Sequence, residues 1–291
     1  MIKKIYALYL RFLTALFGID FAKKFDVYLR FRRKLNLKNP KTLADKVTYL
    51  FLHKSSPLFS ICTDKWAVRD YIASKGLKEI LIPTLGGPWS KVEEIDFDKL
   101  PEKFILKATH SCAMNLLVWD KSKLDIANCK KKLQYWLDTT YGTYSIEPHY
   151  KTIPHRIYAE QVLGNRKGLI DYKFHCCNGK PQFIMACRDR DLYKAGHQQV
   201  RELFDTEWHD LSQNVIPPGK AITPKPANLS YMLEIAKTLA IDFTFVRVDL
   251  YEVEGKVYFG ELTFSPTGGT FPTYSNKFIE EMGEKLQLPS D

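Results

Sequence analysis

Apolar and polar residues alternate most clearly between residues 245 and 264, FVRVDLYEVEGKVYFGELTF, in two runs separated by Glu-Gly-Lys. β-Branched and aromatic runs on both sides of a short glycine-containing turn predict a β-hairpin. With a three-residue loop at Glu-Gly-Lys, Asp249 lies opposite Glu261, and Arg247 lies opposite Thr263. On the other face this register collects Val246, Val248, Leu250, Tyr258, Leu262 and Phe264. A slip by one residue would mix the two faces, so the segregation favours this register.

A second hairpin is predicted at residues 171–190, DYKFHCCNGKPQFIMACRDR, because Asn-Gly between alternating runs is the strongest short hairpin signal. Placing Cys177 opposite Lys180 gives an apolar face of Tyr172, Phe174, Phe183 and Met185. In this register Lys173 and Arg188 project to the same side of the hairpin. An ordinary solvated sheet face would show the same pattern.

The remaining pattern alternates helices, strands and loops. Helical spacing and capping residues predict helices at 44–53, 63–75, 125–140 and 228–241, and a last helix beginning near Ser275. Strands are expected at 103–108, 115–119 and 156–163, and loops at 81–90, 109–114 and 266–270. The sum is an α+β chain whose later part is mostly antiparallel.

The turn-rich segment 164–168 is the expected boundary between two lobes. It divides the chain into a basic helical N-terminal region at 1–100, a first lobe at 101–163 and a second lobe at 164–291.

The beginning of the chain is apolar from Ile5 onward and predicts a helix. One face of this helix collects Ile5, Leu8, Phe12, Ala15 and Ile19. Arg11 interrupts the apolar run, which is shorter than the roughly 20 residues of a spanning helix. Two interpretations remain: an anchor lying in the plane of an anionic membrane surface through residues 1–40, or a helix docked on the protein's own core with a solvated basic flank.

The formal net charge of +10 is concentrated at the N-terminus. Residues 1–50 contain twelve Lys or Arg and three Asp, which gives +9. The rest of the 291 residues is nearly neutral, so nucleic acid is not an expected partner, whereas a local anionic partner is. The six cysteines lack the spacing of a zinc site and predict buried thiols in a reducing cytoplasm.

Asp249 and Glu261 raise a chemical question, because like charges directly opposite each other across strands repel. Arg247 on the same face would neutralise them and make a salt-bridged sheet face. Alternatively the two carboxylates bind Mg²⁺, which takes one or two carboxylates and completes its shell with water and phosphate oxygens. Upstream lysines favour the second reading: Lys107 ends a strand before a small-residue loop, and Lys173 lies on a hairpin. Such lysines can bind nucleotide phosphates while the metal bridges them.

Five segments together resemble the TupA-like ATP-grasp proteins, named for teichuronopeptide biosynthesis. They are DKWAVRDYI, KFILKATHSCAMNLLV, YAEQVL, DYKFHCCNGKP and VRVDLYEVEGKVYFGELTFSPTGG, and they span roughly residues 40–275. The resemblance implies an ATP-grasp fold, in which two α+β lobes clasp ATP. It also implies joining of a carboxylic acid to an amine through an acyl phosphate.

The resemblance assigns roles to individual residues. It implies that the ATP phosphates are bound by Lys107, Lys173, His110 and Ser111. It implies that the adenine is bound by Glu160, Gln161, Val162 and Leu163. Magnesium falls to Asp249, Glu261 and Thr263, and catalysis to Arg247, Lys173 and Arg188. Substrate binding falls to Arg188, Arg190, Gly268 and Gly269. Two positions depart from the family pattern: no glycine follows His110, and Thr263 replaces an asparagine.

The resemblance therefore predicts an ATP- and Mg²⁺-dependent carboxylate–amine ligase. The expected substrates are a uronic-acid-type carboxylate of an anionic, lipid-linked polysaccharide precursor and an amino acid. The expected location is the bacterial cytoplasm, at the cytoplasmic face of the inner membrane. A glycan kinase and a non-catalytic nucleotide-binding subunit of a glycan-assembly complex are the alternatives, and the pattern assigns no oligomeric state.

Overall fold

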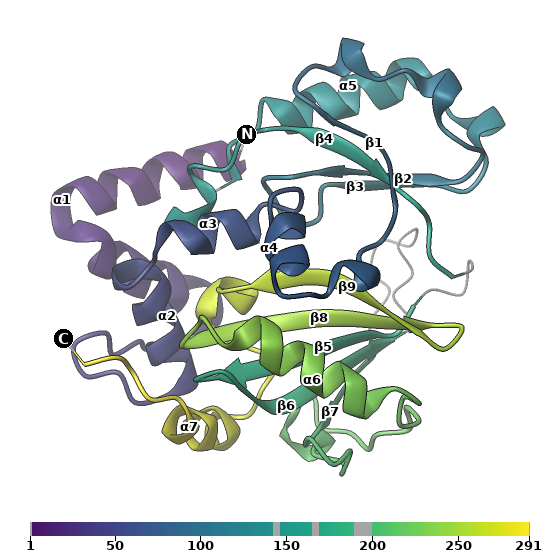
Figure 1. The fold of residues 1–291 in the computed structure, drawn as a ribbon. Coiled ribbons are helices and arrows are strands. Elements are labelled where there is room, and N and C mark those ends of the chain that lie inside the picture. Colours follow the sequence, from purple (N-terminus) through teal and green to yellow (C-terminus); the bar gives the residue numbers. More distant parts are fainter. Residues whose placement is uncertain (1, 142–145, 165–168, 189–199, 291) are drawn as a thin grey trace. The chain divides into compact units, whose positions relative to one another are not determined.

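The computed structural model describes residues 2–141, 146–164, 169–188 and 200–290 (Figure 1). Chain contacts divide the protein into two compact units. Unit 1 comprises Met1–Ser55, Tyr144–Pro148 and Gly164–Asp291, and unit 2 comprises Ser56–Thr143 and His149–Leu163. The chain thus passes into unit 1 at Gly164, and the first 100 residues are shared between the units.

Unit 2 is built on a four-stranded antiparallel sheet. The strand order is β1 (Thr84–Trp89), β4 (Ile157–Glu160), β2 (Phe104–Ala108) and β3 (Asn115–Val118). Its helices are α3 (Pro57–Thr63), α4 (Val68–Ser74), α5 (Ile126–Leu137) and the short η1 (Lys78–Ile80), η2 (Val92–Glu94), η3 (Phe97–Lys99) and η4 (Lys121–Lys123). A further short helix, η6 (Pro148–Tyr150), begins in unit 1 and ends in unit 2. The core joins the sheet to α5 through Phe104, Leu106, Leu133, Trp136 and Ile157.

Strand β1 corrects the expectation of a loop at 81–90. Gly86, Gly87 and Pro88 are poor strand formers, yet β1 is an edge strand, where proline is tolerated. A Cβ on Gly87 would lie 2.9 Å from the Ile157 carbonyl oxygen, so glycine allows the close approach of β1 to β4. The expected helix at 63–75 is shorter, since the Asp64 side chain caps a turn and regular helix starts at Val68.

Unit 1 is built on a five-stranded antiparallel sheet. The strand order is β7 (Val200–Phe204), β6 (Lys180–Arg188), β5 (Asp171–Cys177), β8 (Phe245–Val253) and β9 (Lys256–Thr263). Its helices are α1 (Ile2–Phe31), α2 (Leu43–His53), α6 (Leu229–Ala240), α7 (Asn276–Lys285) and the short η7 (Ser212–Asn214) and η8 (Pro266–Gly269). Helix α6 packs against β5, β6 and β8 (Figure 1).

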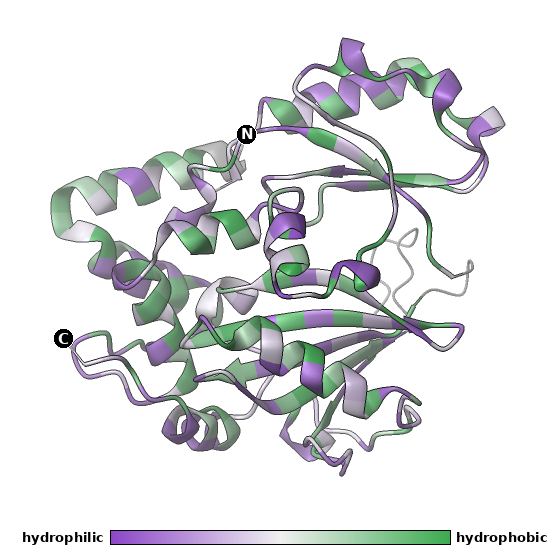
Figure 2. Cartoon of the chain, in the orientation of Figure 1, coloured by the Kyte–Doolittle hydropathy of each residue, from purple (hydrophilic) through white to green (hydrophobic). Residues whose placement is uncertain are grey.

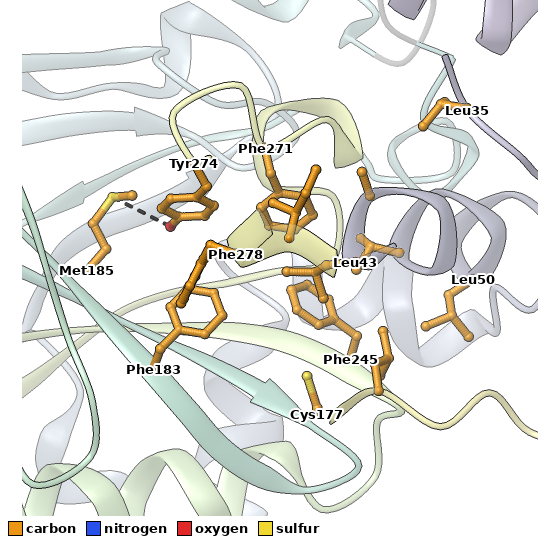
Figure 3. Packing of buried hydrophobic residues seen from close by; sticks show 14 of the residues in the cluster. Leu35, Leu43, Leu50, Cys177, Phe183, Met185, Phe245, Phe271, Tyr274 and Phe278 are labelled. Atoms are coloured by element: carbon orange, nitrogen blue, oxygen red, sulfur yellow. Dashed lines mark hydrogen bonds between the residues drawn. The ribbon is translucent and has the colours of Figure 1, made fainter. Parts of the chain in front are cut away.

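The opposite face of the sheet is partly covered by α2, α7 and the segment between η8 and α7. Phe183 and Phe245 of the sheet pack with Phe271, Tyr274 and Phe278 in one buried cluster (Figure 3). Leu43 and Leu50 of α2 complete the cluster, which fixes the segment after η8 against the sheet. Side-chain caps define where both helices begin: Thr42 and Asp45 form a capping box on α2, and Ser275 caps α7 as its sequence predicts.

The β8–β9 hairpin confirms the predicted pairs Asp249–Glu261 and Arg247–Thr263. The predicted three-residue loop is wrong, because Val253 pairs with Lys256 across a two-residue turn. A bulge between Asp249 and Leu250 restores the predicted register on the inner half. On the outer half Leu250 pairs with Phe259, so Val257 and Phe259 are buried and Tyr258, predicted on the apolar face, is not.

The β5–β6 hairpin confirms Cys177 opposite Lys180, but a bulge follows His175. Lys173 therefore lies opposite Met185, and His175 opposite Phe183, so those two apolar residues share the face of Lys173. Arg188 follows Cys187, which shares the face of Asp171, so Arg188 projects to the face opposite Lys173. The prediction that Lys173 and Arg188 lie on one side is wrong.

We expect Gly283→Ala to destabilise unit 1, because the added Cβ would lie 2.3 Å from the Lys41 carbonyl oxygen and 2.8 Å from the Leu43 nitrogen. Helix α7 must move away from α2, which should lower the free energy of unfolding by about 2 kcal/mol even though alanine favours a helix by about 1 kcal/mol. Urea unfolding measures this. Gly219→Ala is the matched control, because nothing lies within 4 Å of its added Cβ, and equal effects of the two changes would contradict the packing account.

Candidate active site

The sheet of unit 1 carries a charged cluster on the face opposite α6. The cluster consists of Asp171 and Lys173 on β5, Arg247 and Asp249 on β8, and Glu261 and Thr263 on β9. Lys173 pairs with Asp249 across β5 and β8, and Asp249 pairs with Glu261 across β8 and β9. Residues directly opposite each other share a face, so the strand register alone brings these side chains together.

Hydrogen bonds explain why the acidic residues tolerate one another. Arg247 donates from Nε to Asp249 Oδ1 at 2.6 Å and from Nη2 to Asp249 Oδ2 at 2.6 Å. The same Nη2 donates to Glu261 Oε1 at 2.9 Å. Lys173 Nζ donates to Asp249 Oδ2 at 2.5 Å and also to Asp171. Asp249 is 1% exposed and thus depends on these two cations for compensation.

The cations stay charged in spite of their burial. Burial alone would lower the pKa of Lys173, but the carboxylates of Asp171 and Asp249 raise it above its usual value. Burial alone would likewise lower the pKa of the Arg247 guanidinium, but Asp249 and Glu261 raise it above its usual value. Three carboxylates and two cations leave the cluster with a net charge of −1.

The cluster fits a hard divalent cation. The described hydrogen bonds of Glu261 use only Oε1, and Oδ1 of Asp171 is buried with no hydrogen-bond partner in the part of the chain that the structure describes. Carboxylate oxygens and a net negative charge are what Mg²⁺ requires of a protein site. Thr263 Oγ1 donates to Glu261 at 3.1 Å and accepts from Arg247 at 3.1 Å, so its hydroxyl orients the glutamate. The sequence-predicted ligands Asp249, Glu261 and Thr263 are therefore in one place, and Asp171 joins them.

Unit 2 brings together two other predicted residues. Lys107 Nζ donates to Glu160 Oε2 at 2.5 Å, across the neighbouring strands β2 and β4. Arg69 on α4 approaches Glu160 Oε1 at 3.5 Å. Arg69 was not singled out from the sequence, although it lies within the segment DKWAVRDYI that carries the resemblance. The backbone N–H of Gln161 donates to the Pro83 carbonyl at 3.0 Å, and Val162 and Leu163 are half-buried.

The 109–114 loop holds His110 in a buried position. Its Nε2 lies 3.0 Å from the Trp136 carbonyl and 3.1 Å from the Thr139 carbonyl, and its ring stacks on His155 with centroids 3.9 Å apart. Burial and the neighbouring His155 lower the pKa of His110 to about 4. In this arrangement His110 stabilises the end of α5. Ser111 Oγ is buried and has no hydrogen-bond partner among the described residues, and the Ser111 carbonyl accepts a hydrogen bond from Lys65.

The glycine loop after β9 forms η8. A Cβ on Gly269 would lie 2.6 Å from Thr48 Oγ1 and 2.8 Å from the Phe51 ring, so this position requires glycine for packing on α2. The N–H of Gly268 donates to the Ser265 carbonyl at 2.8 Å. A Cβ on Gly268 would lie 3.4 Å from Lys23 Nζ.

Lys23 is a residue that the sequence analysis counted only as part of a basic segment. It is 2% exposed, and its ammonium lies 5.3 Å from the centroid of the Phe51 ring. Burial lowers its pKa, against the opposing effect of Glu147 and Asp26. Charge and helical spacing gave no signal for it, because its burial depends on contacts with α2 and η8 far along the chain.

The predicted substrate arginines lie elsewhere. Arg188 Nη2 contacts Glu202 Oε1 at 3.3 Å, and Glu202 also accepts the backbone N–H groups of Ile222 and Thr223. Arg188 is therefore engaged on the face of the sheet opposite the charged cluster. Arg190 lies outside the described residues.

Comparison with protein families gives one match, which extends over most of the chain. The profile described as TupA-like ATPgrasp matches residues 45–287. The chain belongs to the TupA-like ATP-grasp family. This membership confirms the resemblance read from the sequence and the predicted α+β ATP-grasp fold, which helix α1 precedes. Among curated protein sequences, none matches the chain significantly.

Solved structures similar to this TupA-like ATP-grasp protein include a ligase, a synthetase and a synthase. D-Alanine–D-alanine ligase from Bacillus anthracis complexed with ATP has a TM-score of 0.47 and 16% identity, over 78% of this chain and 63% of that chain. D-Cycloserine synthetase DcsG has a TM-score of 0.44 and 14% identity, over 79% of this chain and 72% of that one. N5-carboxyaminoimidazole synthase from Aspergillus clavatus, in complex with ADP and 5-aminoimidazole ribonucleotide, has a TM-score of 0.43 and 12% identity, over 79% and 52%. The chain thus spans less than two thirds of the length of the first of these ligases.

We expect stability to fall as the pH drops from 6.5 toward 4, in part because of His110. Its folded pKa of about 4 lies below the usual 6.5, so in this window the unfolded chain takes up a proton that the folded protein refuses. The contribution grows to about 3 kcal/mol at the acid end. His110→Gln should therefore lose less stability between pH 7 and pH 4.5 than the parent, as measured by urea unfolding at both pH values. The exposed His209→Gln is the control, and an equal loss in parent and His110→Gln would contradict the assignment.

Proposed function

We propose that this protein is an ATP-dependent carboxylate–amine ligase with ATP and Mg²⁺ as cofactors. The observation that carries the proposal is the cluster around Asp249 and Glu261, whose opposed carboxylates share Arg247 and keep a net negative charge beside Lys173. Membership in the TupA-like ATP-grasp family supports reading this cluster as a metal–phosphate site.

The residues divide the binding of magnesium–ATP among them. Asp249 and Glu261 would hold the metal, which would supply neutralisation of charge on the phosphate oxygens. Thr263 orients Glu261. Lys173 and Lys107 are the proposed phosphate-binding lysines, and each would exchange part of its present carboxylate contact for phosphate oxygen. Glu160, Gln161, Val162 and Leu163 bind the adenine, while His110 and Ser111 support the phosphate-binding loop.

Arg247 stabilises the transferring phosphoryl group. Its guanidinium is held by Asp249 and Glu261 at both sides, so its orientation is fixed before substrate binds. A fixed, always charged donor set stabilises developing negative charge without reorganisation. Lys173 remains protonated beside it for the same reason.

The reaction joins a carboxylate to an amine in two steps. A carboxylate oxygen attacks the γ-phosphorus of ATP and releases ADP, and the amine then attacks the acyl carbon and releases phosphate, leaving an amide. Gly268 and Gly269 are the proposed contacts of the substrate carboxylate, and Lys23, whose Nζ lies 3.4 Å from a Cβ built on Gly268, is proposed to add a positive charge there. Arg190 remains a proposed contact for a further acidic group of the substrate, whereas Arg188, on the face opposite the charged cluster, has no role in this proposal.

The substrate class follows the family and the charge distribution. A uronic-acid-type carboxylate of an anionic, lipid-linked polysaccharide precursor and an amino acid are the proposed reactants. The positive charge of residues 1–50 supports an anionic partner. An enzyme that consumes ATP on such a precursor works at the cytoplasmic face of the bacterial inner membrane.

We expect Glu261→Gln to abolish Mg²⁺-dependent ADP release in assays that pair uronic-acid glycans with single amino acids. Asp249→Asn should also abolish it, but at a cost in stability, because Arg247 and Lys173 lose their shared partner. Glu254→Gln, exposed at the turn of the same hairpin, is the matched control and should retain activity. Isothermal titration of ATP with and without Mg²⁺ reports the metal site independently of turnover. Full activity of Glu261→Gln would reject the metal site. ATP binding without turnover in the parent would favour a non-catalytic subunit. A phosphorylated glycan formed without an amine would favour a kinase.

We expect Lys23→Met to raise the KM for the carboxylate substrate by about tenfold or more, because a hydrogen bond to a charged group contributes about 1.5–3 kcal/mol. The KM for ATP should not change. Lys24→Met, the neighbouring half-buried lysine, controls for the loss of one positive charge from α1. A rise in the KM for ATP, or equal effects of the two variants, would show that Lys23 does not meet the carboxylate.

A further inference from the structure

Helix α1 exposes a continuous apolar side. Ile5 is 60% exposed, Leu8 63%, Phe12 59% and Leu16 58%. Their spacing of three and four residues places them on one side of the helix. Figure 2 shows hydrophobic residues recurring along α1 in unit 1. Side chains of this size in one contiguous stripe indicate an interaction surface rather than scattered surface residues.

The opposite side of the same helix is already packed. Leu10 and Leu13 are buried in a cluster with Ala22 and Ile146, and Ala7 is also buried. The helix is therefore docked on unit 1 through one side, and the exposed side is not needed for that contact. Of the two interpretations of the N-terminus, docking accounts for the buried side and leaves the other side to a partner.

The helix bends at Gly18, whose φ of 81° is not helical, and the apolar surface continues past the bend. Phe17 and Phe21 are 59% and 45% exposed, and their ring centroids lie 4.9 Å apart. Aromatic rings of this kind are enriched where a protein meets the boundary between headgroups and acyl chains.

The charge around this surface selects the partner. Arg11, Arg30, Arg32 and Lys34 are exposed, whereas Asp26 and Asp45 are buried. Asp20 is the remaining acid among residues 1–50, and it contacts His53 at 2.7 Å. The exposed charges of the described part of this N-terminal region are thus mostly positive, which is complementary to anionic phospholipid. A second copy of the chain would bring like charges together, which disfavours a dimer through this side.

The geometry favours a helix lying in the membrane plane. By length and hydropathy Ile5–Phe31 could cross a bilayer. The straight part from Ile5 to Phe17 measures only about 20 Å at 1.5 Å per residue, against about 30 Å of hydrocarbon, and one side of it is committed to the protein.

We propose that α1 binds the surface of an anionic bilayer through the side formed by Ile5, Leu8, Phe12 and Leu16, extended by Phe17 and Phe21. The apolar side chains enter the headgroup boundary, and the exposed arginines and Lys34 contact lipid phosphates. This surface specifies the proposed location at the membrane and is independent of the ligase reaction.

The test is co-sedimentation of the full chain with vesicles. The chain should bind vesicles of phosphatidylcholine mixed with phosphatidylglycerol, bind vesicles of phosphatidylcholine alone more weakly, and be released by high salt and by alkaline carbonate. Failure of the parent to bind anionic vesicles overturns the proposal, and retention after alkaline carbonate overturns the in-plane geometry in favour of a spanning helix.

Matched variants assign the binding to this side of α1. Phe12→Glu with Leu16→Glu should reduce partitioning into anionic vesicles by about tenfold or more. Ile222→Glu with Ile241→Glu changes two equally exposed apolar residues and the net charge by the same amount, and should bind like the parent. Equal loss of vesicle binding in the two double variants would show that the effect comes from net charge alone, and it would overturn the proposed surface. Sedimentation velocity without lipid tests for a dimer. If the parent binds no lipid but forms a dimer, and only Phe12→Glu with Leu16→Glu abolishes that dimer, this side of α1 binds a second copy of the chain.

The ligase proposal is tested separately in the same samples. Magnesium-dependent ATP binding should be unchanged in both double variants, and far-ultraviolet circular dichroism with thermal melting should report an intact fold. Loss of lipid binding with intact ATP binding therefore concerns α1 alone, and loss of ATP binding in the parent concerns the proposed function alone.

Discussion

The contact between Asp249 and its two cations is the constraint around which the sheet of unit 1 is arranged. A carboxylate that is 1% exposed must be compensated, and Arg247 and Lys173 can do so only if β5, β8 and β9 keep their register at this point. The bulge next to Asp249 keeps that register while allowing a tight turn at the hairpin tip. Gly260 makes the bulge possible, since a Cβ there would lie 3.0 Å from the Asp249 carbonyl oxygen. The charged cluster and the backbone irregularity beside it therefore depend on each other.

Unit 2 contains a smaller arrangement of the same kind, in which a lysine is paired with a carboxylate. Lys107 and Glu160 neutralise each other at 2.5 Å, with Arg69 nearby. In both units the lysine proposed for phosphate is held by a carboxylate. Such pairing orients the ammonium, and it makes an anionic ligand compete with an existing partner. The affinity for phosphate then depends on the stabilisation that each carboxylate obtains from a metal ion or another hydrogen-bond donor when its lysine moves to the phosphate.

The sequence was informative where periodicity and local chemistry act together. The pairing of Asp249 with Glu261 followed from the segregation of two faces, and the helix beginning after Ser275 followed from its cap. Bulges shift the register without leaving a signal in the alternation of residues, so the faces of Arg188 and Tyr258 were placed wrongly. Strand β1 was missed because its glycines and proline are used for close approach at a sheet edge. The burial of Lys23 results from long-range packing that no local pattern reveals.

Helix α1 carries Lys23 as well as the apolar side. The residue beside the glycine loop and the residues that would face lipid thus belong to one element of one unit. If that element rests on a bilayer, the glycine loop stands at a set height above the headgroups. A sugar attached to a lipid carrier could then reach the loop only when the length of its linker matches that height. The N-terminal helix would thus select substrates by the length of this linker as well as by their chemistry.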